Sequence, residues 1–266
     1  TGVSDEPTNT DEEQQEEALA EGTLLSHLIE LRSRLVKVSI AVIGIFVILL
    51  PFSQKIFVVV SQPLVEVLPG QKMIATAVAS PLLTPFKLTF FVALFVAMPV
   101  ILYQVWAFVA PGLYKKEKRF AFPLLGSSIL LFYAGIAFAY FVVFELVFGF
   151  FASITPQSVE MMTDIAAYLD FITKIFLAFG LAFEVPIATV LMVWTGLTTP
   201  EKLGKARPYV FLMAFIVGMF LTPPDVISQT LLAVPVYLLY ELGIIMSRIF
   251  ARDRRRDRDE TVAADG

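Results

Sequence analysis

Two long runs of this chain carry no charged side chain, residues 88–110 and residues 120–144. Each run meets the roughly 20 apolar residues that a helix needs to cross a bilayer. Backbone polar groups in hydrocarbon must find partners within the protein, and a helix supplies them within one segment. The sequence therefore predicts an all-α integral membrane protein.

Apolar residues make up 57% of the chain and cluster in six runs, so six transmembrane helices are expected. They lie at about 36–53, 88–110, 120–149, 170–195, 209–222 and 227–247. Span 5 is short, because about 14 residues give about 21 Å of helix against roughly 30 Å of hydrocarbon. Either it thins the membrane locally, or flanking residues extend it.

The charged residues gather at the two ends of the chain. Residues 1–21 hold eight acids and no base, so residues 1–22 are predicted to be a disordered acidic tail. That tail is not a signal peptide, because it lacks a basic start and an early apolar core. Six arginines fall within residues 248–258, and residues 251–266 form a charged C-terminal tail. The membrane domain is expected to be residues 23–250.

Lysine and arginine are distributed unevenly between the two sets of connecting segments. Sixteen lie on the side of both termini, and four, Lys55, Lys72, Lys87 and Lys174, lie on the other side. Because positive residues concentrate in cytoplasmic segments, both termini are predicted to be cytoplasmic.

Motifs of catalysis are missing from the sequence. There is no cysteine, which excludes thiol catalysis and disulfides, and the single histidine argues against a histidine metal site. No HExxH motif, catalytic Ser–His pair or glycine-rich phosphate loop occurs. We therefore expect no enzyme, no cofactor and no nucleic-acid partner.

One carboxylate, Glu117, sits in the basic segment GLYKKEKR at 112–119. On a helix its neighbours three and four residues away are uncharged, which leaves it without an internal partner. It is either a solvated glutamate that moderates a basic loop, or a carboxylate that awaits a positive charge from another molecule.

A second carboxylate, Glu30, lies on the polar stripe of an amphipathic helix that enters the interface at 23–35. Arg34 follows at the i,i+4 spacing that favours an ion pair within the helix. The alternative is that Glu30 acts as a second carboxylate beside Glu117 at the same membrane face.

The acid at mid-depth of span 4, Glu184, is costly there and by default suggests function. It is either protonated and donates to a carbonyl freed by Pro186, or it faces a water-filled groove, or it accepts a polar group from a partner helix. Thr222 and Gln229 either bond across helices or satisfy their own hairpin.

Several long blocks closely resemble the TatC family, the largest core subunit of the twin-arginine protein translocase, over residues 23–250. They are HLIELRSRL (27–35), MIATAVASPLLTPFKLTF (73–90), PVILYQVWAFVAPGLYKKEKR (99–119), FEVPIA (183–188), RPYV (207–210) and LTPPDVISQTLLAVPVYLLYE (221–241). One departure is Glu145, where the family leads us to expect proline.

The resemblance implies a glove-shaped, concave bundle of six helices in the bacterial inner membrane, with both termini cytoplasmic and helices 5 and 6 short. It implies a receptor for folded cargo that carries a twin-arginine signal peptide. The recognition glutamates would be Glu30 and Glu117, and Phe108, Lys115 and Lys116 would belong to the same cytoplasmic patch.

The resemblance also implies partners, the single-span subunits TatA and TatB, within a TatBC complex that holds several copies of this chain. They would dock along the edge of spans 5 and 6, at Met219, Thr222 and Gln229, while Glu184 would face the concave groove. A different class stays open, a proton-coupled small-molecule transporter that uses Glu184. The lack of an internal repeat argues against it.

Overall fold

The computed structural model describes residues 9–67, 73–109, 118–156, 162–222 and 225–264. Within these ranges every regular element is helical, apart from one isolated bridge between Ile74 and Asp164. The predicted all-α class is therefore confirmed for the described chain. The elements are α1 (Asn9–Leu49), η1 (Leu50–Phe52), α2 (Ser53–Val67), α3 (Ser80–Val96), α4 (Met98–Val109), α5 (Lys118–Phe138), the π-helix η3 (Ala139–Val143), α6 (Phe144–Ile154), α7 (Ile165–Ala182), α8 (Val185–Trp194), α9 (Pro200–Lys205), α10 (Arg207–Leu221) and α11 (Val226–Ala264).

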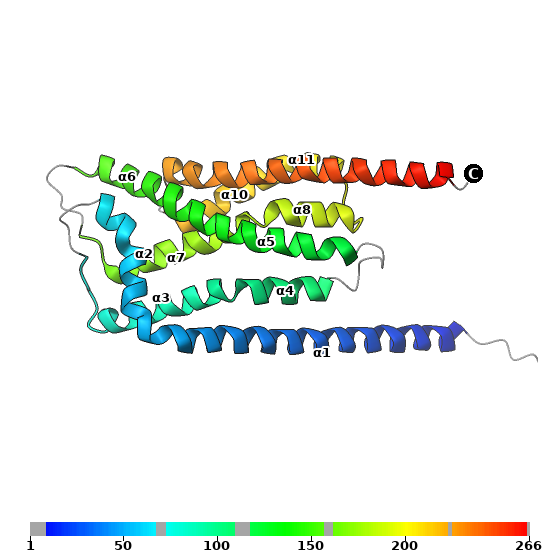
Figure 1. Ribbon diagram of the computed structural model, residues 1–266, viewed down its shortest axis with the longest axis horizontal. Helices are drawn as coiled ribbons and strands as arrows, with labels where there is room; N and C mark the ends of the chain where they lie inside the picture. Colours follow the sequence, from blue (N-terminus) through cyan, green and yellow to red (C-terminus); the bar gives the residue numbers. More distant parts are fainter. Residues whose placement is uncertain (1–8, 68–72, 110–117, 157–161, 223–224, 265–266) are drawn as a thin grey trace, which may run out of the picture.

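Most of the helices run along one common direction (Figure 1). The first residues of α1 and the last residues of α11 extend at the same end of the molecule, which we call the terminal end. The opposite end, called the distal end, holds α2, the start of α3, the end of α6 and the start of α7.

Four helical stretches are long and apolar enough to cross a membrane: Leu28–Gln62, Phe122–Ile154, Ile165–Trp194 and Val226–Arg252. The bent pair of α3 and α4 is a fifth candidate if it forms one span. The remaining predicted span corresponds to α10, an apolar helix of 15 residues. At about 1.5 Å per residue, α10 is shorter than the hydrocarbon is thick.

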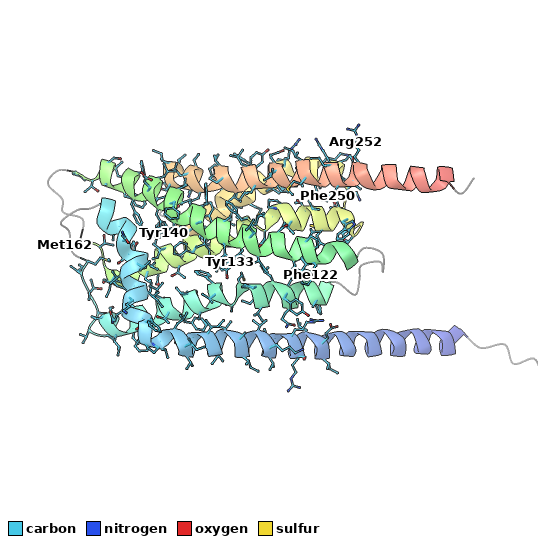
Figure 2. All side chains as sticks on the ribbon, viewed as in Figure 1. Phe122, Tyr133, Tyr140, Met162, Phe250 and Arg252 are labelled. Carbon is cyan, nitrogen blue, oxygen red and sulfur yellow. The ribbon has the colours of Figure 1, made fainter. Side chains whose placement is uncertain are left out.

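Proline explains the bend of 48° between α3 and α4. Pro99, near the start of α4, has no N–H to donate to the carbonyl of Phe95 one turn earlier. The hydroxyl of Tyr133 on α5 donates to that carbonyl at 3.1 Å instead (Figure 2). Pro186 is the second residue of α8, as Pro99 is the second residue of α4, and it follows the break between α7 and α8.

The third span continues without interruption past the unexpected glutamate. Glu145 lies in the first turn of α6, directly after the π-helical stretch η3, and its side chain is exposed. An acid there keeps the backbone N–H that a proline would lack, so the helix remains unbroken from Phe122 to Ile154.

The core lies where α3, α5, α6 and α7 meet, and aromatic rings fill much of it. Its fully buried members include Phe132, Phe144 and Phe179. Two glycines let α5 and α7 approach each other closely. A Cβ at Gly135 would lie 2.5 Å from the carbonyl oxygen of Phe179, and one at Gly180 would lie 2.6 Å from the ring of Phe132. Small residues at such contacts are the usual means of bringing membrane helices together.

The two ends of the chain differ from the sequence-based expectation. The backbone of residues 9–22 is helical and continuous with the first span, where a disordered acidic tail was predicted. Glutamate, glutamine and alanine favour helix, and extending an existing helix avoids the cost of nucleation. At the other end, α11 continues through residues 251–264 of the charged tail and is 39 residues long, so the sixth helix is not short as the resemblance implied.

Candidate functional site

A polar junction joins α1 to the last turn of α4. Arg34 on α1 donates from Nε to Glu30 Oε1 at 3.0 Å and from Nη2 to the same oxygen at 2.5 Å. Its Nη1 donates to Gln104 Oε1 at 3.2 Å, and Nη2 also donates to the carbonyl oxygen of Ala107 at 2.9 Å. A single guanidinium therefore holds a carboxylate in place and ties two helices together.

The surroundings of this junction are apolar and only partly open to solvent. The side chains of Arg34 and Glu30 are 19% and 35% exposed. Trp106 on α4 is buried, and Phe108, the residue after Ala107, is half-buried. Partial exclusion of water strengthens charge-assisted hydrogen bonds, so the arrangement suits recognition of a guanidinium group.

The intrahelical pair that the i,i+4 spacing predicted for Glu30 is present. A role for Glu30 as a second carboxylate beside Glu117 stays a prediction. Glu30 Oε2 accepts no hydrogen bond from any other described residue. Glu117, Lys115 and Lys116 lie outside the described residues.

The mid-span acid Glu184 sits between α7 and α8, at the turn before Pro186. The buried hydroxyl of Ser128 on α5 donates to Glu184 Oε2. The other oxygen, Oε1, is buried and accepts no hydrogen bond from the described part of the protein. Acceptance of a polar group from a partner helix stays a prediction for Glu184.

The hairpin of α10 and α11 holds the three remaining predicted residues. Met219 is exposed on α10, whereas Thr222 is buried and donates to the carbonyl of Gly218 at 3.0 Å. Gly218 lies against the backbone of Gln229, with a Cβ built on it 3.7 Å from the Cα of Gln229. Thr222 therefore satisfies its own helix, while Met219 is the residue of this set that faces outward.

An ion pair that the sequence did not predict joins α10 to α11. Arg207 donates from Nε to Glu241 Oε1 at 2.6 Å and from Nη2 to Oε2 at 2.8 Å. Tyr237 donates its hydroxyl to Glu241 Oε1 at 2.9 Å. An acid within an otherwise apolar run was the only available signal, since residues 34 positions apart follow no periodicity.

Long apolar helices, with polar contacts confined to their junctions, define a polytopic α-helical membrane protein. The family model described as "Sec-independent protein translocase protein (TatC)" matches residues 26–235, so the chain belongs to the TatC family. It is a membrane component of the Sec-independent protein translocase of the twin-arginine (Tat) pathway, and its role is transport.

Similar proteins agree over most of the chain. The Sec-independent protein translocase protein TatC of Azotobacter chroococcum is 59% identical over 91% of this chain and 94% of its own length. The protein of the same name from Escherichia coli strain K12 is 58% identical over 89% of this chain and 92% of its own length. A crystal structure described as the twin-arginine translocase receptor TatC superposes with a TM-score of 0.77, at 37% identity, over 84% of this chain and 98% of that one.

Proposed function

We propose that the protein is the receptor that binds twin-arginine signal peptides at the terminal end of the bundle. Glu30 and Glu117 would each take one arginine of the pair, and Phe108, Lys115 and Lys116 would border the site. The observation that carries this proposal is the contact of Arg34 with Glu30, because a guanidinium group already fits this carboxylate. The solved relative is itself described as a receptor of the translocase.

We call the pair of Glu30 and Glu117 the clamp, and its chemistry favours arginine over lysine. A guanidinium presents parallel N–H groups to carboxylate oxygens, whereas an ammonium is a compact point charge without that fork. A charge-assisted hydrogen bond contributes about 1.5–3 kcal/mol where water is partly excluded. An incoming arginine would bind Glu30 through Oε2, or would displace Arg34 toward Gln104 and the Ala107 carbonyl, which already accept from it.

We further propose six spans with both termini in the cytoplasm of a bacterial inner membrane, arranged as a concave glove, with residues 23–250 as the membrane domain. Support comes from the excess of lysine and arginine, sixteen against four, on the side of the termini. The chain ends also share one end of the molecule (Figure 1).

Partner subunits TatA and TatB would dock along α10 and α11, in a complex that holds several copies of this chain. The face of α10 is apolar and exposed, with Phe220 74% and Met219 47% accessible. Thr222 and Gln229 line the adjoining turn of the hairpin. Glu184 would accept a polar side chain from a partner helix, since its buried Oε1 has no donor among the described residues.

Site-specific photocrosslinking in membranes tests the receptor function. A photoreactive signal peptide should crosslink to the wild-type protein and lose most of this product in the Glu30→Gln and Glu117→Gln double variant. An Arg32→Gln variant, altered two residues from Glu30 on the same helix, controls for general loss of charge. Unchanged crosslinking in the folded double variant would refute the clamp.

A further inference from the structure

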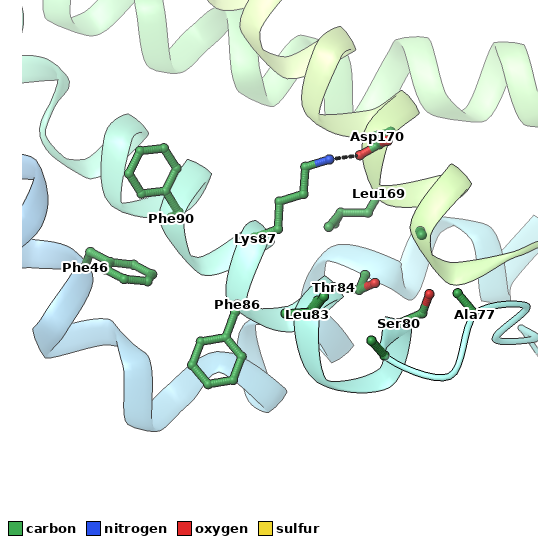
Figure 3. Close-up of a pocket in the computed structure, with 12 residues that line it drawn as sticks. Phe46, Ala77, Ser80, Leu83, Thr84, Phe86, Lys87, Phe90, Leu169 and Asp170 are labelled. Carbon is green, nitrogen blue, oxygen red and sulfur yellow. Dashed lines mark hydrogen bonds and ion pairs between the residues drawn. The ribbon is translucent and has the colours of Figure 1, made fainter.

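A groove of about 570 Å³ opens near the distal end, between α1, α3 and α7 (Figure 3). Its volume lies in the range of small-molecule binding sites. One charged pair interrupts its largely apolar wall, in which Lys87 of α3 donates to Asp170 of α7. The hydroxyl-bearing residues Ser80 and Thr84 also line the groove. The apolar wall includes Phe46, Leu83, Phe86, Phe90 and Leu169.

The position of the pair along its helices places it near the edge of the hydrocarbon. Lys87 follows Ser80, the first residue of α3, by seven residues, or about 10 Å of helix. Asp170 follows Ile165, the first residue of α7, by five residues, or about 8 Å. Headgroup layers occupy roughly the outer 5–8 Å on each side of the bilayer. If both helices begin at the outer edge of the headgroup layer, the pair lies close to the level where lipid headgroups meet acyl chains.

The ion pair is open to whatever fills the groove. The side chains of Lys87 and Asp170 are 53% and 47% exposed, although they contact each other. Lysine has three donor hydrogens and a carboxylate has about four acceptor sites, so each group keeps unused capacity. At this depth the surroundings are lipid, and charged groups in lipid pair with other charged or polar groups.

We propose that this groove binds a membrane phospholipid with a phosphoethanolamine headgroup. The ammonium of Lys87 contacts the lipid phosphate, the carboxylate of Asp170 accepts hydrogen bonds from the lipid ammonium, and an acyl chain lies along the aromatic wall. A purely anionic headgroup would gain from Lys87 and be repelled by Asp170. A phosphocholine headgroup would satisfy the charges but has no N–H to donate.

Binding of defined lipids, measured by native mass spectrometry, tests the proposal. The full-length protein is stripped of lipid in detergent, then mixed with equal amounts of phosphatidylethanolamine, phosphatidylcholine and phosphatidylglycerol with identical acyl chains. We expect the wild type to retain phosphatidylethanolamine about five- to tenfold over each of the others, the ratio expected of one partly exposed charge-assisted hydrogen bond.

Two variants separate the roles of the charged groups. Asp170→Asn should lose the preference for phosphatidylethanolamine over phosphatidylcholine but still retain phospholipid. Lys87→Gln should lose retention of all three lipids. Lys174→Gln, which changes an exposed lysine one turn further along α7 and outside the groove lining, is the matched control and should behave as wild type.

The proposal is overturned if the wild type shows no preference for phosphatidylethanolamine over the other two lipids. It is also overturned if the Lys87→Gln and Asp170→Asn variants keep that preference. A second measurement tests the proposal even if those two variants do not fold. Benzoyl-phenylalanine at Leu83, in membranes with a tagged phosphatidylethanolamine, should label that lipid. Capture of a protein segment there in place of lipid would contradict the assignment.

Discussion

Arg34 directs two of its N–H groups, Nε and Nη2, to one oxygen of Glu30, at 3.0 Å and 2.5 Å. The same guanidinium reaches Gln104 and the Ala107 carbonyl on α4. The carboxylate at the centre of the proposed clamp is therefore oriented by the protein before any peptide arrives. Preorganisation of this kind lowers the entropy cost of binding.

Replacing Arg34 by lysine tests that junction. Lysine keeps the positive charge, but its three N–H groups radiate from one nitrogen and cannot reproduce the planar fork that reaches Glu30, Gln104 and Ala107. We expect Arg34→Lys to lower the free energy of unfolding by about 1–2 kcal/mol, measured by thermal unfolding in detergent. Arg32→Lys, at an exposed position of the same helix, should have little effect. Equal losses in the two variants would contradict the bridging role.

Gly135→Ala should destabilise the contact of α5 with α7. The new Cβ would meet the Phe179 carbonyl at 2.5 Å, and backbone cannot move as easily as a side chain. Overpacking of this kind costs about 1–3 kcal/mol, read as a lower melting temperature. Gly126→Ala on the same helix has open space around its Cβ and should be neutral or slightly stabilising. A neutral Gly135→Ala would show that the helices are not so closely packed.

Ser128 and Glu184 should be energetically coupled. Ser128→Ala removes the hydrogen bond to Oε2 and leaves both oxygens of Glu184 without a donor among the described residues. The expected loss is about 1–3 kcal/mol of unfolding free energy. In a Glu184→Leu background the same serine change should cost much less, and a double-mutant cycle of melting temperatures measures the difference. Strictly additive effects would contradict the coupling.

Asp164, just before α7, should make stability depend on acid pH. Hydrogen bonds from the backbone of Ala167, and from the side chain and backbone of Thr76, lower the pKa of its carboxyl to about 2. Because the pKa in the folded protein is depressed, this stabilisation is present above the ordinary value near 4 and is lost as pH falls toward 2. Asp164→Asn should flatten the decline of melting temperature between pH 4 and pH 2. An unchanged decline would contradict this role.

Features local in sequence were largely predictable. Long apolar runs located the third and sixth apolar stretches, observed at Phe122–Ile154 and Val226–Arg252, within about five residues. The i,i+4 spacing predicted the pair of Glu30 with Arg34, and proline predicted the bend at Pro99.

Contacts between distant segments were not predictable from the sequence. Ser128 and Glu184 lie 56 positions apart, and Arg34 and Gln104 lie 70 apart. No periodicity relates such residues, because helix rotation and depth decide which side chains meet. The helical backbone of residues 9–22 was missed for another reason, since their high charge suggested disorder although their helix propensity is high.

The most direct test of the receptor account is the affinity of purified protein for a signal peptide with two arginines against one with two lysines. In the wild type the arginine peptide should bind at least about tenfold more tightly, because lysine cannot form the fork. In the Glu30→Gln and Glu117→Gln double variant this preference should fall to about one. A folded double variant that kept the full preference for arginine would contradict the account.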